Sequence, residues 1–314
     1  MTAAVVEFEN IRKAYANVQA LHGLSLTIPS GCIYGFLGPN GAGKSTSLRI
    51  LVGILRADSG EIRVLGETDP TRIKQRIGYL PEEKGLYKKM PVLELVAYFG
   101  QLKGLSRRDA RQRARTMLEA YGLGKWLKSR CEALSKGMSQ KVQILSTLIH
   151  EPELVILDEP FSGLDPVNIE LVRNTMLDLK KQGRSLIFST HIMEQAEQVC
   201  DRLVLINHGA KVLEGPTGEI RRSAGRSLTI DYEGDSSILH ELPGIERLND
   251  AGQTAELTLA PGTDPQQLLQ ILVDKLRIRR FDTRESSLHE IFVRAVQDAP
   301  NGDADANANI EEQI

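Results

Sequence analysis

The chain has 314 residues, with 39 Lys and Arg against 41 Asp and Glu, which gives a formal net charge of −2. A chain of this length predicts two domains, each large enough to bury its own core. The near-neutral charge excludes recruitment of nucleic acid or anionic lipid by the charge of the chain as a whole.

Cysteine content and the length of apolar runs indicate the compartment. Cys32, Cys131 and Cys200 are scattered without paired spacing, which argues against disulfides and zinc and for a reducing compartment. The stretch from Met1 to Asn10 lacks the long apolar core of a signal peptide. No run approaches the roughly 18 apolar residues of a spanning helix, so we expect any membrane role to come through a partner.

The N-terminal residues predict short strands around a glycine-rich loop. Alternating apolar and polar residues predict strands at 5–8, 24–28 and 61–66. An apolar run at 33–37 then leads directly into the loop, and helix-like residues follow it at 47–52. This strand–loop–helix order is the context that a phosphate-binding motif requires.

The loop is a complete G-x-x-x-x-G-K-[ST] motif made of Gly38, Pro39, Asn40, Gly41, Ala42, Gly43, Lys44, Ser45 and Thr46. Its glycines let backbone N–H groups curl around an anion, and the start of the following helix adds positive potential. Lys44 can reach the terminal phosphates, and the Ser45 hydroxyl can ligate Mg²⁺. The motif therefore predicts binding of a nucleoside triphosphate.

Residues 92–128 have a helical pattern that is rich in Arg, Lys and Glu. Ser106, followed by Arg107, Arg108 and Asp109, has the character of a helix start within this region. We interpret the charge as a solvated helix face, because charge runs usually are.

Three apolar runs then predict buried strands, each of which leads into polar residues. The runs and their polar ends are 154–157 with Asp158 and Glu159, 185–188 with Ser189, Thr190 and His191, and 203–206 with Asn207, His208 and Gly209. Between the first two runs, a helix is predicted at 166–182, with Asp165 before it and Gly183 after it. Strands that are apolar throughout and alternate with helices indicate a parallel sheet covered on both faces.

The polar residues at these strand ends carry the predicted chemistry, because ligands bind at the carboxyl ends of strands in open α/β sheets. Asp158 suits a role as a partner of Mg²⁺, which prefers hard oxygen ligands. Glu159 is the natural base or water-orienting group for attack on the γ-phosphate. His191 could hydrogen-bond the γ-phosphate and report its presence.

After about residue 216 the pattern changes to that of a small α+β module. Strands are predicted at 228–232 and 255–259, a helix at 265–276, and an extended segment at 278–281. Ser287-Leu288-His289-Glu290 is a capping box that opens a last helix. From Asp298 the Asn, Ala, Asp and Glu residues have no strong apolar periodicity and predict disorder.

Taken in order, these residues resemble the nucleotide-binding subunits of ABC transporters, from about residue 5 to residue 220. The correspondences are Gly38–Thr46 with Walker A, Leu154–Glu159 with Walker B and its catalytic glutamate, Leu134–Gln140 (Leu-Ser-Lys-Gly-Met-Ser-Gln) with the signature sequence, Ser162–Asp165 with the D-loop, His191 with the switch histidine, and Tyr15 with the aromatic that stacks on adenine. The signature sequence separates this family from other phosphate-loop proteins.

The resemblance implies a mechanism that a single chain does not complete. In the family, two nucleotide-binding domains meet head to tail and enclose ATP between the Walker motifs of one and the signature of the other. Ser135 and the Gly137 N–H would then contact the γ-phosphate held by Lys44 of a second domain, and Asp165 would lie at the same interface. The second domain would be a copy of this chain or a paralogue, and hydrolysis would remove the charge that both domains grip.

Two positions depart from the family pattern. The usual signature is Leu-Ser-Gly-Gly-Gln, whereas this chain has Lys136 and Met138. Glu82 stands where the Q-loop usually supplies glutamine. Glu82 could approach Mg²⁺, but its negative charge beside a phosphate means that we do not expect it to perform the glutamine's role unchanged. The surface at 78–94 is the predicted site of coupling to a membrane subunit.

The C-terminal module and the motif variants resemble the ATPases of ABC-2-type exporters, a group that includes drug-resistance and sodium-efflux systems. The implied organisation is an ABC ATPase domain over 1–220 with a helical subdomain at about 86–140, a small α+β domain over 221–298, and a disordered acidic tail over 299–314. The implied fold is a P-loop α/β core with a mainly parallel mixed sheet, an antiparallel β subdomain and a helical subdomain.

The implied function is ATP hydrolysis with Mg²⁺, coupled to a multispanning ABC-2-type permease at the inner face of the cell membrane, with no nucleic acid partner. The alternative is a soluble ABC-type ATPase that acts in translation, DNA repair or iron–sulfur assembly. The chain has one ATPase core, no sustained heptads and an appended C-terminal domain, all of which argue against this alternative. A nucleotide-binding regulator without turnover is opposed by the presence of both Glu159 and His191.

Overall fold

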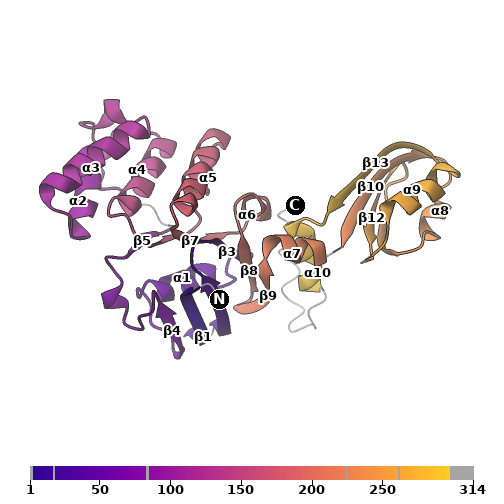
Figure 1. Ribbon diagram of the computed structural model, residues 1–314, viewed down its shortest axis with the longest axis horizontal. Coiled ribbons are helices and arrows are strands. Elements are labelled where there is room, and N and C mark those ends of the chain that lie inside the picture. Colours follow the sequence, from indigo (N-terminus) through magenta and orange to yellow (C-terminus); the bar gives the residue numbers. More distant parts are fainter. Residues whose placement is uncertain (1–2, 17, 83–84, 224, 261, 298–314) are drawn as a thin grey trace. The chain divides into compact units, whose positions relative to one another are not determined.

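The computed structural model describes residues 3–16, 18–82, 85–223, 225–260 and 262–297. The chain divides into two compact units, residues 1–217 and 218–314 (Figure 1). The tail predicted to be disordered, 299–314, lies outside the described residues.

The larger sheet of the first unit has six strands in the order β5-β6-β7-β3-β8-β9. Strands β5 to β8 in this order run parallel, whereas β9 pairs antiparallel with β8. The strands are β3 (Ile33–Leu37), β5 (Ile77–Leu80), β6 (Leu154–Leu157), β7 (Ser185–Thr190), β8 (Arg202–Asn207) and β9 (Ala210–Pro216). Every residue of β3, β6 and β7 is buried, as expected for strands covered on both faces. The predicted mainly parallel sheet is confirmed.

A second, antiparallel sheet of the first unit has the order β2-β1-β4. Its strands are β1 (Ala4–Tyr15), β2 (Val18–Pro29) and β4 (Ser59–Val64), so two of them are much longer than the sequence predicted. One core joins the two sheets, because Phe8 of β1 packs against Phe36 of β3 with ring centroids 6.2 Å apart. The antiparallel sheet therefore supports the strand that leads into the phosphate loop.

The helices of the first unit cover the sheet and form a separate helical cluster. They are α1 (Lys44–Leu51), α2 (Val92–Leu102), α3 (Arg107–Ala120), α4 (Lys136–Leu148), α5 (Pro166–Lys181) and α6 (Met193–Glu197), with single 3₁₀ turns at η1 (Pro70–Arg72), η2 (Gly124–Trp126) and η3 (Cys131–Ala133). The next helix, α7 (Thr217–Ser223), lies at the boundary between the two units and belongs mostly to the second. The Ser106 hydroxyl accepts a hydrogen bond from the Asp109 N–H, which confirms the predicted helix start. Asp165 caps α5 in the same way through the Asn168 N–H.

Helices α2, α3 and α4 share a core of their own (Figure 1). The buried positions of α3 are Ala110, Ala114 and Leu118, which recur every four residues and form one apolar stripe. The charged residues of α3 lie mostly outside this stripe and are exposed, so the interpretation of this charge as a solvated face holds for most of the helix. The cluster includes α4, which begins within the predicted signature sequence.

The second unit is a four-stranded antiparallel sheet in the order β11-β12-β10-β13. Its elements are β10 (Arg226–Glu233), α8 (Ser237–His240), β11 (Ile245–Asp250), β12 (Thr254–Leu259), α9 (Pro265–Val273), β13 (Arg277–Glu285) and α10 (Leu288–Gln297). Leu268 and Leu272 of α9 pack with apolar side chains of β10 and β12 in a separate core. The predicted strands and helices of the α+β module are thus present, and the sequence reading missed β11.

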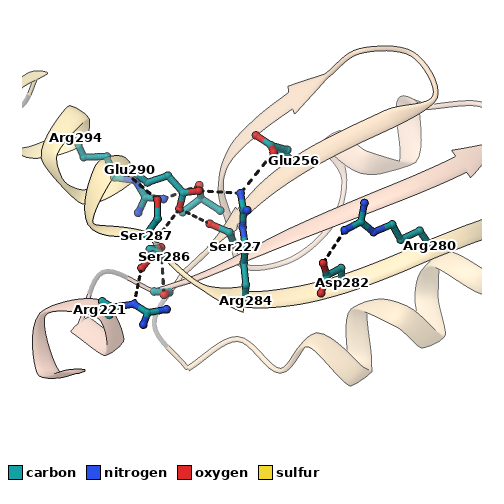
Figure 2. A network of polar contacts seen from close by, with 12 residues as sticks. Arg221, Ser227, Glu256, Arg280, Asp282, Arg284, Ser286, Ser287, Glu290 and Arg294 are labelled. Atoms are coloured by element: carbon teal, nitrogen blue, oxygen red, sulfur yellow. Dashed lines mark hydrogen bonds and ion pairs between the residues drawn. The ribbon is translucent and has the colours of Figure 1, made fainter. Parts of the chain in front are cut away.

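The last helix is held by a network of polar contacts around Glu290 (Figure 2). The Glu290 carboxylate accepts hydrogen bonds from the Ser227 hydroxyl at 3.0 Å, from Arg284 at 3.0 Å and from the Ser287 N–H at 3.1 Å. The Glu290 N–H in turn donates to the Ser287 hydroxyl at 3.2 Å. Both bonds of the predicted capping box are therefore present. The bonds from Ser227 and Arg284 join the helix to β10 and β13.

Within the described part of the chain, no helix is long and apolar enough to cross a membrane.

His150 follows α4 at the end of the helical cluster and provides a test of the packing. Its Nε2 atom lies 3.0 Å from the Ile77 carbonyl oxygen, while Nδ1 is buried without a hydrogen-bond partner among the described residues. Burial, with Lys103 and Arg184 nearby, lowers the pKa of His150 from 6.5 to about 4.

Between these two pKa values the unfolded chain binds more protons than the folded chain, so the free energy of unfolding falls as the pH drops from 6.5 towards 4. Between pH 7 and pH 5 we expect the free energy of unfolding to fall by about 2 kcal/mol less in His150→Gln than in the wild type. Urea unfolding of both proteins at the two pH values measures this difference. An identical loss in the variant would contradict the assigned shift.

Candidate functional site

The phosphate loop joins the carboxyl end of β3 to the first residue of α1, Lys44. It forms one side of a pocket of about 260 Å³. The lining residues are Ala20, Asn40, Gly41, Ala42, Gly43, Lys44, Ser45, Thr46, Glu82 and Glu159. Because the backbone N–H groups of the first helical turn have no intrahelical partner, this pocket favours an anion.

Two glycines allow the loop to pass close to neighbouring backbone. Gly38 has φ +148°, and a Cβ atom added there would collide with the Ile206 carbonyl oxygen. Gly43 has φ +102°, and its added Cβ would lie 2.6 Å from the Ala20 carbonyl oxygen. Only glycine fits such conformations and approaches without strain.

The loop is hydrogen-bonded to a turn that is distant in the sequence and that the sequence did not indicate as a neighbour. The Gly209 N–H donates to the Ala42 carbonyl at 3.0 Å, and the His22 N–H donates to the Gly209 carbonyl at 2.9 Å. Gly209 lies in the β8–β9 turn and His22 in β2. The Asn207-His208-Gly209 sequence at the end of an apolar strand was the available signal for this turn.

Lys44 is nearly fully buried at the floor of the pocket. Its ammonium group donates to the carbonyl oxygens of Gly38 at 2.7 Å and Pro39 at 3.0 Å, and it lies 3.7 Å from the Glu159 carboxylate. Burial lowers the pKa of Lys44, while the charges of Glu159, Asp158 and Glu82 act in the opposite direction. The Lys44 ammonium group is thus held in place by carbonyl oxygens and carboxylates. A phosphate that binds in the pocket would contact a cation whose position is already fixed.

Asp158 is fully buried at the end of β6 and joins three elements. Its Oδ1 atom accepts hydrogen bonds from the Ser45 hydroxyl of α1 at 3.0 Å and from the Ser189 hydroxyl of β7 at 2.6 Å. Its Oδ2 atom is buried without a hydrogen-bond partner in the described chain. A buried carboxylate oxygen left unpartnered is costly, so the Ser45 and Asp158 oxygens fit a divalent cation.

Glu159 and His191 are brought together at the pocket wall. The His191 Nδ1 atom lies 3.0 Å from the Glu159 carboxylate, and the Glu159 N–H donates to the Ser189 hydroxyl at 2.9 Å. Glu159 has φ +46°, a left-handed conformation that is uncommon for a residue with a side chain and is found at functional sites. Ser189 therefore holds the carboxylate of Asp158 and the backbone of Glu159. The sequence alone indicated no separate role for Ser189 beside His191.

The remaining predicted site residues divide between the pocket and other surfaces. Glu82 lines the pocket opposite the phosphate loop. Tyr15 ends β1 and is 42% exposed, with the Lys13 ammonium 5.6 Å from its ring centroid. Ser135, Gly137 and Asp165 are not part of the pocket lining. The nucleotide contacts predicted for these three residues would have to be made with another chain.

The signature and D-loop segments pack against each other. Ser135 caps α4 by accepting a hydrogen bond from the Met138 N–H at 3.3 Å. The Lys136 ammonium occupies the space beside Gly163, where an added Cβ would collide with it. Gly137 packs on Asn168, whose N–H is bound by Asp165. This contact joins the start of α4 to the start of α5 on one surface.

Comparison with family models identifies two matching regions. Residues 21–162 match the family described as ABC transporter. Residues 215–296 match the family described as ATP-binding protein DrrA1-3-like, C-terminal domain. The first match contains the phosphate-loop site, and the second contains the antiparallel sheet of the second unit.

Similar proteins cover nearly the whole chain. An uncharacterized ABC transporter ATP-binding protein, YhaQ of Bacillus subtilis, is 39% identical over 93% of this chain and 98% of its own length. The Nod factor export ATP-binding protein I of Rhizobium sp. (strain N33) is 33% identical over 94% of this chain and 97% of its own. The daunorubicin/doxorubicin resistance ATP-binding protein DrrA of Streptomyces peucetius is 32% identical, with 98% and 97% covered.

A solved structure described as an ATP binding subunit of an ABC transporter matches 69% of this chain and 92% of its own length. Its TM-score is 0.64 and its sequence identity is 31%.

The contact at Gly38 generates a test of the loop. We expect Gly38→Ala to weaken nucleotide binding more than 10-fold and to destabilise the fold by about 2 kcal/mol, because the strained φ and the collision with Ile206 force the loop to move. Titration with a fluorescent ATP analogue and chemical unfolding measure the two effects.

Gly41→Ala is the matched control, because Gly41 has φ +79° but nothing within 4 Å of an added Cβ. We expect it to cost about 1 kcal/mol from backbone strain alone. Equal effects of the two substitutions would show that the close approach at Gly38 does not matter.

Proposed function

Because the chain belongs to the ABC transporter ATP-binding proteins and carries a DrrA-like C-terminal domain, we propose that it powers an ABC-2-type membrane exporter. It is an ATPase subunit of this family. The observation that carries the proposed ATP-driven mechanism is that the predicted nucleotide contacts are divided between two surfaces of one chain. The pocket holds Lys44, Ser45 and Glu159, whereas Ser135 at the start of α4 lies outside its lining.

Lys44 and the loop N–H groups would hold the phosphates of ATP. A cation already fixed by two carbonyl oxygens needs little rearrangement to meet a phosphate, and the helix start adds donors aimed at the same point. The oxygens of Ser45 and Asp158 would hold Mg²⁺, which would neutralise charge on the phosphate oxygens. Glu82 lines the same pocket and could approach Mg²⁺, although we do not expect it to perform the role of the usual glutamine unchanged.

Glu159 would orient and deprotonate the attacking water. Its carboxylate faces the pocket, and its backbone is held by Ser189 in a strained conformation that directs the side chain. His191 lies on Glu159 at 3.0 Å and is partly exposed, so it could bind both the carboxylate and the γ-phosphate. A positioned base and a hydrogen-bond donor at one phosphate are the parts that phosphoryl transfer to water requires.

Two such chains would close head to tail around ATP. The exposed Ser135 and the buried backbone of Gly137 mark the N-terminus of a 13-residue helix, which favours an anion presented by a second chain. Lys136 adds a positive charge there, so its departure from the usual glycine is compatible with phosphate binding. Because Asp165 and Lys136 belong to one packed surface, the D-loop would enter the interface with the signature.

The transport role follows from the named relatives, one of which is a Nod factor export protein and another a daunorubicin/doxorubicin resistance protein. The membrane partner would be a multispanning ABC-2-type permease that contacts the segment at 78–94, and the ATPase would lie peripherally at the inner face of the membrane. No observation on this chain favours the alternative of an ATPase that acts without a membrane partner.

The substitution Glu159→Gln tests the catalytic assignment. Glutamine keeps the size of the side chain but cannot accept a proton, so we expect ATP hydrolysis to fall about 100-fold or more while ATP binding persists. The bound ATP should then trap a dimer, detectable by sedimentation. The double variant Glu159→Gln/Ser135→Arg should stay monomeric with ATP, because the added side chain blocks the signature surface. Unchanged hydrolysis in the single variant would remove Glu159 from the mechanism.

Affinity isolation of the tagged chain from gently solubilised membranes tests the exporter proposal. We expect a multispanning protein in about equal amount, retained in the Glu159→Gln variant because the coupling surface is unaltered. Recovery from the soluble fraction alone, together with ribosomal or assembly proteins, would overturn the proposal.

A further inference from the structure

Positive charge is concentrated in the helical cluster. The segment 86–141 contains 13 Lys and Arg residues against 4 Asp and Glu residues, whereas the whole chain has a net charge of −2. The rest of the chain is therefore strongly acidic. A surface that differs this much from the rest of its chain has a local electrostatic preference that the net charge conceals.

Two separate stretches of this segment are joined into one surface. The N–H groups of Val92 and Leu93 donate to the carbonyl oxygens of Ser129 and Leu127 at 3.0 and 3.1 Å. On the same side, the Cys131 N–H donates to the Met90 carbonyl at 3.0 Å. These bonds fix residues 88–93 beside residues 127–131, so cations that are about 40 positions apart in the sequence share one surface.

The cations of this surface are Lys88, Lys89, Lys125, Lys128 and Arg130, which we call the basic surface. All five side chains are exposed. Arg130 lies 3.5 Å from Glu132. No carboxylate of the described chain lies within ion-pair distance of the four lysines, whereas Arg111, Arg113 and Arg115 of the helical cluster each have such a partner. The positive charge of the basic surface is thus left available to an external anion.

Amphipathic aromatic side chains accompany these lysines. Tyr87 precedes Lys88 and is 58% exposed, with its ring packed edge-on against Tyr98 at 6.0 Å between centroids. Trp126 lies between Lys125 and Leu127 and is half-buried against the helical core. Tyr and Trp that are at least partly exposed beside Lys are the combination found at the level of lipid headgroups.

We propose that the basic surface binds the anionic headgroups of a membrane directly. Each Lys or Arg close to an anionic lipid surface contributes about 1 kcal/mol, so the four unpaired lysines are enough for measurable binding. Lys88 and Lys89 also belong to the segment 78–94 that is proposed to contact the permease. Because lysine is depleted from the cores of protein–protein interfaces, we place the basic surface at the edge of that contact, where it can meet lipid headgroups. The inference adds a lipid contact to the proposed function, and it rests on that function only for bringing the chain to a membrane.

The test uses the purified full chain with vesicles that contain no permease. We expect the protein to sediment with vesicles of 70% phosphatidylcholine and 30% phosphatidylglycerol but not with phosphatidylcholine alone, because anionic headgroups give a membrane a negative surface potential of roughly 30 mV that attracts lysines. Binding should weaken as salt rises from about 0.05 to 0.5 M, because salt screens exposed charges. The variant Lys88→Glu/Lys125→Glu/Lys128→Glu should bind the anionic vesicles on the order of 100-fold more weakly.

The control variant Arg72→Glu/Lys181→Glu/Arg277→Glu changes the net charge by the same amount at exposed positions outside the basic surface. It should bind the anionic vesicles like the wild type, and ATP hydrolysis in solution should be unchanged in both triple variants. Equal binding to neutral and anionic vesicles, or equal losses in the two triple variants, would overturn the proposal.

One further outcome would also overturn the lipid proposal: the wild type does not bind anionic vesicles, and the triple lysine variant no longer co-purifies with the permease. The basic surface would then be assigned to an acidic protein partner. The proposed function is tested separately by the hydrolysis and affinity measurements, so its failure would be recognised independently.

Discussion

The hydrogen bonds to the buried carboxylate of Asp158 are the constraint on which the site depends. Through Ser45 and Ser189, this one side chain links the helix after the phosphate loop to two neighbouring strands of the parallel sheet. A buried carboxylate is stable only when it is hydrogen-bonded or coordinated, so the three elements cannot separate without exposing an unpaired charge. The same Ser189 accepts the N–H of Glu159 and thereby fixes the next residue along the chain.

Binding and hydrolysis would therefore be coupled at the strand ends. Ser189 bonds both to Asp158, the proposed metal ligand, and to Glu159, the proposed base. The left-handed backbone of Glu159 is tolerated because packing on both faces of the sheet leaves the strand ends little freedom to relax. A phosphate that engages Lys44 also changes the electrostatic surroundings of Glu159, since the two charges lie 3.7 Å apart.

The helical cluster contributes in a different way from the sheet. Its apolar stripe serves the packing of α2, α3 and α4, while its exposed side carries an excess of positive charge that the rest of the chain does not have. The start of α4 meets the start of α5 through Lys136 and Gly163, so the surface predicted to receive a second nucleotide-binding domain is physically joined to the strand ends of the core. A movement of the helical cluster would therefore displace both the start of α4 and the segment between β6 and α5.

Local sequence was sufficient for elements whose signals are contained within a few residues. The phosphate loop, the start of α3 at Ser106, the cap of α5 at Asp165 and the capping box of α10 all depend on short-range hydrogen bonds and backbone conformations. The buried strands β3, β6, β7 and β8 were equally readable, because strands covered on both faces are apolar throughout. The short strand β5 was not predicted. The long antiparallel strands β1 and β2 were underestimated, because their exposed residues break the apolar pattern.

Contacts between distant residues were decided by the tertiary structure alone. The sequence identified Asp158, Glu159 and His191. It did not indicate that Ser189 holds the Asp158 carboxylate and the Glu159 backbone, or that the Gly209 N–H bonds to the phosphate loop. It also indicated the charge of residues 86–141 without indicating that Lys88 and Lys128 share one surface. By itself the sequence determined which chemical groups the chain carries and the local structures that present them. Only the fold decided which of those groups meet, because hydrogen bonds between separate strands depend on sheet order and register rather than on neighbouring residues.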